Sequence, residues 1–296
     1  SQTQPEAKPC VVLVDPYSTG AMLAPELDAR GFSVIALWSK ECGSNRGRLP
    51  KAAKGFPEKF LAEVDEQASL AETAEALRKV AAGAELAAVM CGGEAGVKVA
   101  DELAEHMGLR GNSTQNGIEN RRDKQVQQEA VQAAGLRSAR SVCGKAWDEV
   151  EAFSKTEAFP IIVKPSESAG SDGVKLCHSV EEARDHFQQL KSSQRRCGSQ
   201  DAAVLLQEYL RGTEYIVDHV SRDGVHKTTM VWVYDKRPAN GAGFVYFGQE
   251  CVLADSPVAQ ELIAYTRGCL DGLQVTNGAT HTEVMMTETG PCLVEV

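Results

Sequence analysis

The most informative segment of this chain is FPIIVKPSESAGSDGV, residues 159–174. Its apolar run predicts a buried strand that ends at Lys164 and Pro165, followed by a loop rich in serine and glycine at residues 166–173. Such loops let backbone N–H groups approach phosphate oxygens closely, and a neighbouring lysine adds positive charge. The spacing is not that of a P-loop, so a flexible hairpin turn is an equal alternative.

On both sides of this segment, short apolar runs alternate with turns. Three segments with helical spacing, residues 121–134, 179–191 and 258–273, interrupt the runs, and Ser179 with Glu182 forms a capping box. This pattern predicts an α+β domain over residues 116–296. The expected strands have the sequences PIIVKP, VKLC, AVLLQEYL, EYIVDHV, TTMVWVY, FVYFGQECVL, THTEVMM and CLVEV.

The first third of the chain has a different order. A strand at residues 10–14, a helix at 21–30 and a strand at 32–38 form a βαβ unit, and residues 69–107 continue it as helix, strand and helix. We therefore expect an N-terminal α/β domain with a parallel, Rossmann-like sheet over residues 1–115. Ligands bind beyond the carboxyl ends of such strands. The loops DPYSTG and GGEAG are therefore candidate substrate contacts, and ordinary strand-to-helix turns are the alternative interpretation. The candidate residues in these loops are Asp15, Ser18, Thr19, Gly20, Gly92, Gly93 and Glu94.

Composition narrows the class of protein. The chain has 296 residues and a formal charge of −10, which argues against a nucleic-acid binder but allows a small anionic ligand in a local basic pocket. The nine cysteines include no C-x-x-C pair, so we expect neither a zinc site nor a disulfide framework. Scattered free thiols are typical of a reducing compartment, so we expect a cytoplasmic location. No apolar run is long enough to span a membrane.

Several charged residues outside the first segment could serve chemistry. Lys124 lies on an expected helix, where most lysines are solvated. Glu208 and Glu214 flank a break at Gly212, and they could bind ribose hydroxyls or be surface charges. Glu283 and Glu295 lie in apolar strands joined by the turn TETG, so they could face each other and bind Mg²⁺, or lie on the solvent face of an edge strand.

Taken in order, these features resemble the ATP-grasp superfamily. The resemblance rests on a helical lysine, a strand ending in Lys-Pro, a Gly/Ser loop, the hinge Q-E-Y-L, a glutamate six residues on, and two late glutamates. The motifs T-H-T-E and L-V-E-V are more narrowly similar to the carboxylate–amine ligases that include L-amino-acid ligases and carnosine synthase.

The resemblance implies a set of site residues. Lys124 and Lys164 would hold the α- and β-phosphates of ATP, and Glu283 and Glu295 would bind Mg²⁺ or Mn²⁺. His281 stands where several relatives carry an arginine that steadies the reacting phosphate, so its role is open. The remaining expected ATP contacts are Ser168, Ala169, Gly170 and Ser171 of the loop, Gln207, Glu208, Tyr209 and Leu210 of the hinge, and Glu214 at the ribose.

The resemblance also implies a reaction. ATP would phosphorylate a substrate carboxylate, and an amine would attack the acyl phosphate to give an amide, with amino acids as the expected partners and a homodimer as a possible assembly. The family pattern continues beyond Val296 with a further metal ligand, so we expect a C-terminally incomplete chain of low activity. The alternatives are a carboxylase or purine-pathway ligase of the same superfamily, a non-catalytic ATP-binding module and, last, a dinucleotide-binding oxidoreductase.

Overall fold

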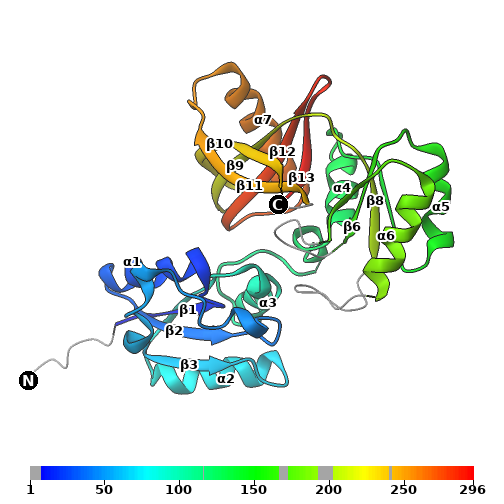
Figure 1. Ribbon diagram of the computed structural model, residues 1–296. Coiled ribbons are helices and arrows are strands. Elements are labelled where there is room, and N and C mark those ends of the chain that lie inside the picture. The colour runs from blue at the N-terminus through cyan, green and yellow to red at the C-terminus, as the bar shows by residue number, and fades with distance from the viewer. Residues whose placement is uncertain (1–7, 116, 167–172, 193–202, 240–241) are drawn as a thin grey trace, which may run out of the picture. The chain divides into compact units, whose positions relative to one another are not determined.

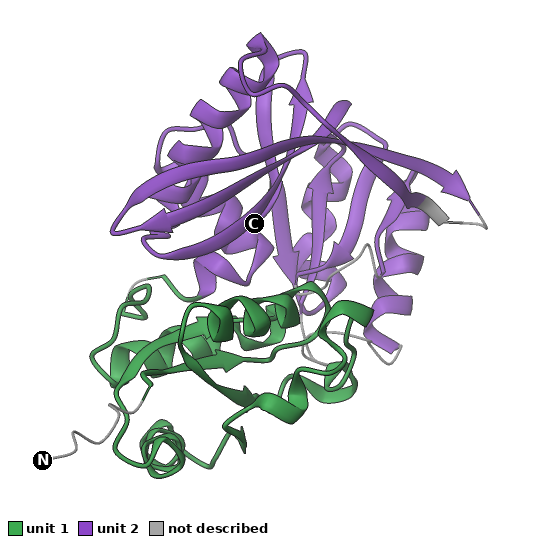
Figure 2. Cartoon of the chain, turned by 90° about the vertical axis from the view of Figure 1, so that its left-hand side faces the viewer, with its two compact units in different colours: residues 1–118 green, residues 119–296 purple. Residues whose placement is uncertain are grey.

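The computed structural model describes residues 8–115, 117–166, 173–192, 203–239 and 242–296. The chain divides into two compact units, Ser1–Ile118 and Glu119–Val296, which are coloured separately in Figure 2. Each unit has its own sheet structure and its own apolar core. Within the described residues, no helix combines the length and apolar character that crossing a membrane requires.

Unit 1 is built on a parallel sheet with the strand order β3-β2-β1-β4. Helices α2 and α3 cover one face of it, and α1 with Phe56 packs on the other. All five residues of β1 are buried because both faces are covered, which explains its continuous apolar sequence. The elements are β1 (Cys10–Val14), α1 (Leu23–Ala29), β2 (Ser33–Trp38), β3 (Ala62–Asp65), α2 (Leu70–Ala81), β4 (Leu86–Cys91) and α3 (Val97–His106) (Figure 1).

Unit 2 begins with helix α4 (Lys124–Ala133) and contains two sheets. The first is antiparallel, has the order β5-β8-β6-β7 and packs against α5 and α6. Ser179 accepts a hydrogen bond from the backbone N–H of Glu182, as the capping box predicts. The elements are β5 (Ser141–Gly144), α5 (Trp147–Thr156), β6 (Ile161–Pro165), β7 (Lys175–Cys177), α6 (Val180–Ser192) and β8 (Val204–Glu208).

The second sheet of unit 2 is also antiparallel and has the order β11-β10-β9-β12-β13. Helices α4 and α7 pack on one of its faces, where Val217, Val231 and Val284 enter the core. The opposite face carries the polar residues discussed below. The elements are β9 (Gly212–Arg222), β10 (Val225–Ala239), β11 (Ala242–Cys251), α7 (Pro257–Gly272), β12 (Gly278–Thr287) and β13 (Gly290–Glu295).

The expected fold class, a parallel α/β domain followed by an α+β domain, is confirmed. Three elements were not expected: β3, β5 and α5. Strand β3 is short and buries only Val64, and α5 begins at an alanine N-cap without a side-chain hydrogen bond, so neither has a strong local signal.

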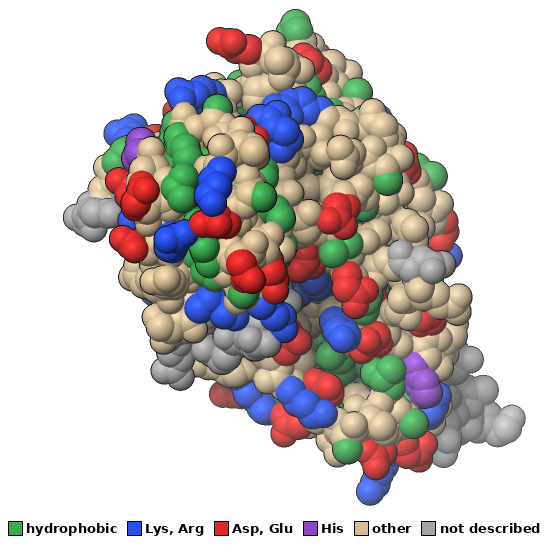
Figure 3. Space-filling model, turned by 90° about the vertical axis from the view of Figure 1, so that its right-hand side faces the viewer, with side chains coloured by type: hydrophobic (Ala, Val, Ile, Leu, Met, Phe, Trp, Pro, Cys, Tyr) green, Lys and Arg blue, Asp and Glu red, His purple; other side chains and the backbone are tan. Residues whose placement is uncertain are grey.

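On the face seen in Figure 3, acidic and basic side chains are interspersed.

Candidate functional site

One pocket of unit 2 collects most of the polar residues that the sequence singled out. Its walls come from both sheets and from the first residue of α4. Apolar and aromatic residues, among them Ile162, Phe244 and Tyr246, line the rest. The polar and charged residues of the lining are Lys124, Lys164, Gln207, Glu208, Tyr209, Glu214, Tyr234, Lys236, Glu283 and Glu295.

Strand alternation explains how three strands contribute to one wall. Glu214 of β9 pairs directly with Met285 of β12, so Glu283, two residues before Met285, lies on the same face. Tyr234 and Lys236 of β10 have the same parity and also line the pocket. Val284, which lies between Glu283 and Met285, points to the opposite face and joins the apolar core.

The two expected metal ligands come together through a β-bulge. Thr287 pairs with Gly290 and Val284 with Leu293, and a regular hairpin would then pair Glu283 with Val294. The register instead shifts by one residue, and Glu283 pairs with Glu295. Bulges often re-aim a side chain next to a site. Here the bulge brings Glu295 to the same pocket as Glu283.

Two expected lysines are buried in this pocket. Lys164 on β6 is 4% exposed and Lys124 is 7% exposed. The solvated surface position considered for Lys124 is therefore wrong. Helix α4 begins at Lys124, directly after the N-cap Asp123, and packs against β13, where the Lys124 Nζ lies 2.9 Å from Glu295 Oε2.

Lys236 and Tyr234 belong to the site but were not expected from the sequence. The Lys236 Nζ lies 2.6 Å from Glu214 Oε1 and 3.6 Å from Glu283 Oε2. The Tyr234 hydroxyl donates to Glu283 Oε1 over 2.8 Å. The expected strand ended at Tyr234, whereas β10 continues to Ala239. Extending the alternation of Trp232 and Tyr234 by one step would have found Lys236.

Burial changes the ionisation of these groups. Burial lowers the pKa of the Lys164 ammonium to about 8 and raises the pKa of the Glu214 carboxyl to about 7, even though Lys236 acts in the opposite direction on Glu214. Burial would also raise the pKa of the Glu295 carboxyl, but Lys124 and Lys164 outweigh it and the net pKa is lowered. Nearby ammonium groups thus outweigh burial at Glu295, whereas at Glu214 they only reduce its effect.

The hinge between β8 and β9 holds two contrasting side chains. Gln207 is 4% exposed, and its Nε2 has no hydrogen-bond partner among the described residues. Glu208 is also buried, but Arg140 lies 2.6 Å from its Oε2 and Arg137 3.3 Å from its Oε1. The Glu208 carboxylate is therefore engaged by arginines, which leaves the backbone of residues 208–210 as the hinge surface that could meet a base.

His281 lies on the same face of β12 as Glu283. Its Nδ1 is 2.8 Å from Asp218 Oδ1, and its Nε2 is 3.3 Å from the Tyr234 hydroxyl. The hydrogen bond with Asp218 raises the pKa of the His281 imidazole. His281 therefore has a fixed orientation, and its catalytic role stays a prediction.

The four expected loop contacts, Ser168, Ala169, Gly170 and Ser171, lie outside the described residues. Within the described part of the chain, no group of three or more His, Cys, Asp or Glu side chains is arranged to hold a metal ion. The pair Glu283 and Glu295 still fits Mg²⁺, because this ion often takes only one or two carboxylates from the protein and completes its shell with phosphates and water.

In unit 1, the two candidate loops contact each other. A Cβ on Gly20 would lie 1.4 Å from the carbonyl oxygen of Gly92, and a Cβ on Gly93 would lie 2.3 Å from the Tyr17 ring. The Asp15 carboxylate is fully buried and accepts hydrogen bonds from the Ser39 backbone N–H (2.8 Å) and hydroxyl (2.5 Å). Close packing of the loops accounts for these glycines, and Asp15 supports the turn after β2.

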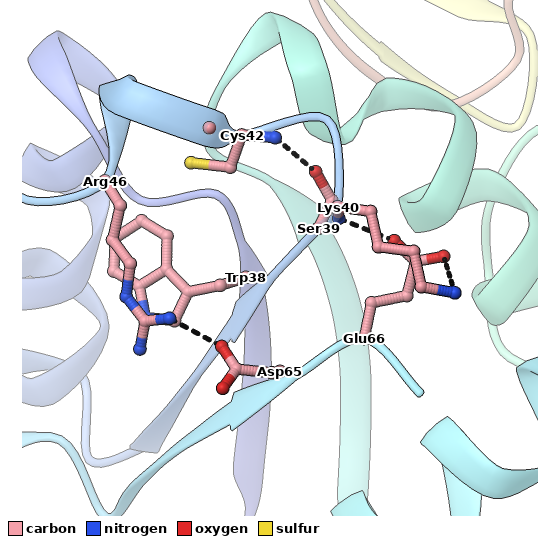
Figure 4. A pocket seen from close by; sticks show the side chains of 8 residues that line it. Trp38, Ser39, Lys40, Cys42, Arg46, Asp65 and Glu66 are labelled. Atoms are coloured by element: carbon pink, nitrogen blue, oxygen red, sulfur yellow. Dashed lines mark hydrogen bonds and ion pairs between the residues drawn. The ribbon is translucent and has the colours of Figure 1, made fainter. Parts of the chain in front are cut away.

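A separate pocket of unit 1 follows the ends of β2 and β3 (Figure 4). Arg46 stacks over the Trp38 ring at 5.0 Å and forms an ion pair with Asp65 at 2.5 Å. Lys40 lies 3.5 Å from Glu66. The cations of this pocket are thus paired with its own carboxylates.

The order of the elements along the chain and the sheets of each unit match a known class of fold. The crystal structure of an L-amino acid ligase from Bacillus licheniformis superimposes with a TM-score of 0.73, covering 98% of this chain and 67% of that chain at 15% identity. Residues 157–296 match the family model of the ATP-grasp domain. This part of unit 2 therefore belongs to the ATP-grasp domain family.

Two curated relatives are a synthase and a ligase by name. Dapdiamide A synthase of Enterobacter agglomerans is 29% identical over 290 residues, which cover 98% of this chain and 66% of the relative. Alanine–anticapsin ligase of Bacillus subtilis (strain 168) is 26% identical over 252 residues, which cover 80% of this chain and 53% of the relative. The chain therefore spans about half to two thirds of the length of these relatives.

Proposed function

We propose that this protein is an ATP- and Mg²⁺-dependent carboxylate–amine ligase that forms an amide bond between amino-acid-like substrates. The observation that carries the proposal is the pocket of unit 2, where three lysines and four glutamates lie beside a buried amide that has no partner among the described residues. The names of the relatives, an alanine–anticapsin ligase and an L-amino acid ligase, support amino acids as the substrate class. Free thiols at all eight described cysteines support a reducing cytoplasmic location.

The residues of the pocket fit ATP. Gln207 Nε2 would donate to a ring nitrogen of adenine, since a buried unpaired amide gains most from a ligand partner. The backbone of Tyr209 and Leu210 would meet the base edge, and Glu214 would accept from the ribose hydroxyls. Lys124 and Lys164 would neutralise the phosphates, and their burial strengthens that interaction.

Glu283 and Glu295 would hold Mg²⁺, which stabilises the charge of the phosphoryl group in transfer. The γ-phosphoryl group would move from ATP to the substrate carboxylate, giving an acyl phosphate and ADP. The amine then attacks the acyl carbon, the C–N bond forms, phosphate leaves, and the amine loses a proton. In this scheme the protein positions the reactants and compensates charge, so it needs no side-chain nucleophile.

The test is amino-acid-dependent release of ADP from Mg-ATP, together with ADP binding measured by calorimetry. We expect release with some pair of amino acids in a pool, and we expect Glu283→Gln to abolish it. Glu288→Gln, which alters an exposed glutamate in the turn of the same hairpin, is the matched control and should retain activity. ADP binding without any release would favour a non-catalytic ATP-binding module, and absence of ADP binding would refute the proposal.

A further inference from the structure

The charges in the pocket of unit 2 balance one another. Apart from Glu208, which Arg137 and Arg140 engage, three ammonium groups and three carboxylates line it, and all six side chains are no more than 30% exposed. Burying charge is costly unless an opposite charge is near, so this balance stabilises the site without any ligand. The six residues are Lys124, Lys164, Lys236, Glu214, Glu283 and Glu295.

Three of the four carboxylate oxygens of Glu283 and Glu295 are already engaged. Glu283 Oε1 accepts from the Tyr234 hydroxyl, and Glu283 Oε2 lies 3.6 Å from the Lys236 Nζ. Glu295 Oε2 lies 2.9 Å from the Lys124 Nζ. A metal ion that takes up these oxygens must therefore compete with two ammonium groups.

Building on the proposed Mg-ATP-dependent function, we propose that Lys236 and Lys124 act as cation placeholders. They hold the carboxylates of Glu283 and Glu295 until nucleotide phosphates arrive, so that a divalent ion binds with nucleotide and not before it. Lys236 is the central placeholder, because it bridges Glu214, the expected ribose contact, and Glu283, the expected metal ligand.

Charge compensation gives the physical reason. A divalent ion that entered alone would add two positive charges to a buried, balanced site and would lie beside Lys236 and Lys124. Nucleotide phosphates bring negative charge that the lysines can neutralise instead. The lysines can then leave the carboxylates without becoming buried and unpaired, and the metal can take their place.

The experiment measures Mn²⁺ binding by the loss of the free-ion signal in electron paramagnetic resonance, without nucleotide. Lys236→Met removes the placeholder charge and should bind Mn²⁺ at least about tenfold more tightly than the unaltered protein. Lys227→Met, an exposed lysine on the same strand, is the matched control and should change nothing. Adding Glu283→Gln to Lys236→Met should remove the gain, because the freed carboxylate is lost.

Unaltered protein that binds Mn²⁺ as tightly alone as with ADP would overturn the proposal, and so would a folded Lys236→Met variant with no gain. Circular dichroism verifies folding, and Lys236→Gln repeats the charge removal should the methionine variant unfold. The gain in Lys236→Met is measured without nucleotide, whereas the proposed function is tested by ADP calorimetry, so the two ideas can fail separately.

Discussion

Gln207 offers a test in which stability and binding should change in opposite directions. Its side chain is 4% exposed, and its Nε2 has no partner among the described residues. A buried amide left unpaired costs about 1–3 kcal/mol. Replacing it by methionine, which has a similar length and no N–H, should therefore stabilise the protein by about 1 kcal/mol. The same change should weaken ADP binding about tenfold, or about 1.4 kcal/mol, because the ligand loses its amide partner.

Gln128 supplies the matched control for this substitution. It is equally buried, but its Nε2 donates to the Leu293 carbonyl at 3.1 Å and its Oε1 accepts from the Ala139 N–H at 2.7 Å. Gln128→Met leaves both backbone groups unpaired and should destabilise the protein by about 2–4 kcal/mol.

Urea denaturation followed by circular dichroism gives the stabilities, and calorimetry gives the ADP affinities. If Gln207→Met destabilised the protein as much as Gln128→Met does, the Gln207 amide would be satisfied within the fold and the reasoning would be wrong. If stability rose while ADP affinity stayed the same, the amide would not contact the nucleotide.

Three further predictions concern buried charges. The pKa of the Lys164 ammonium is about 8 in the folded chain, against an ordinary value of 10.5. Between pH 8 and pH 10.5 the unfolded chain therefore binds more protons than the folded chain, and the free energy of unfolding should rise as the pH increases through that range. Lys164→Met should lack this rise in urea midpoints, and an unchanged pH profile would contradict the assignment. Glu208→Gln should lower stability by about 1 kcal/mol, because Arg137 loses its carboxylate while Arg140 keeps Glu157. ADP affinity should stay within about twofold, and a large loss of affinity would mean that the carboxylate itself meets the nucleotide. Asp15→Ala should lower the free energy of unfolding by about 2 kcal/mol, and with it the melting temperature, because two Ser39 donors lose their acceptor. ADP binding should not change. A variant as stable as the parent would show that those donors find other partners.

The strands of this fold could be predicted where the burial of successive side chains matches the pattern of apolar residues in the sequence. The continuous apolar run of β1 follows from a sheet covered on both faces, and the alternation of β12 follows from a sheet with one polar face. The helix α5 was missed because it lacks a capping side chain, and the edge strand β3 because it buries a single residue.

The sequence indicated many of the residues that line the candidate site, but it did not indicate which partners those residues contact. The burial of Lys124 depends on β13, which lies more than a hundred and fifty positions later in the chain, and no local pattern reports that contact. Glu208 was expected to meet adenine, but its partners Arg137 and Arg140 come from the segment between α4 and β5. Lys236 was missed for a local reason, since the predicted strand ended one alternation too early.

The bulge in the hairpin of β12 and β13 also determines which changes in length the gene can carry here. The extra residue is Val294, and while it is present only the bulge lets Glu295 pair with Glu283. Losing the single codon for Val294 would restore a regular hairpin in which the glutamate follows Leu293 directly and still pairs with Glu283. A three-base deletion at this valine would therefore leave both carboxylates on one face of the sheet, whereas replacing either glutamate would remove one of them.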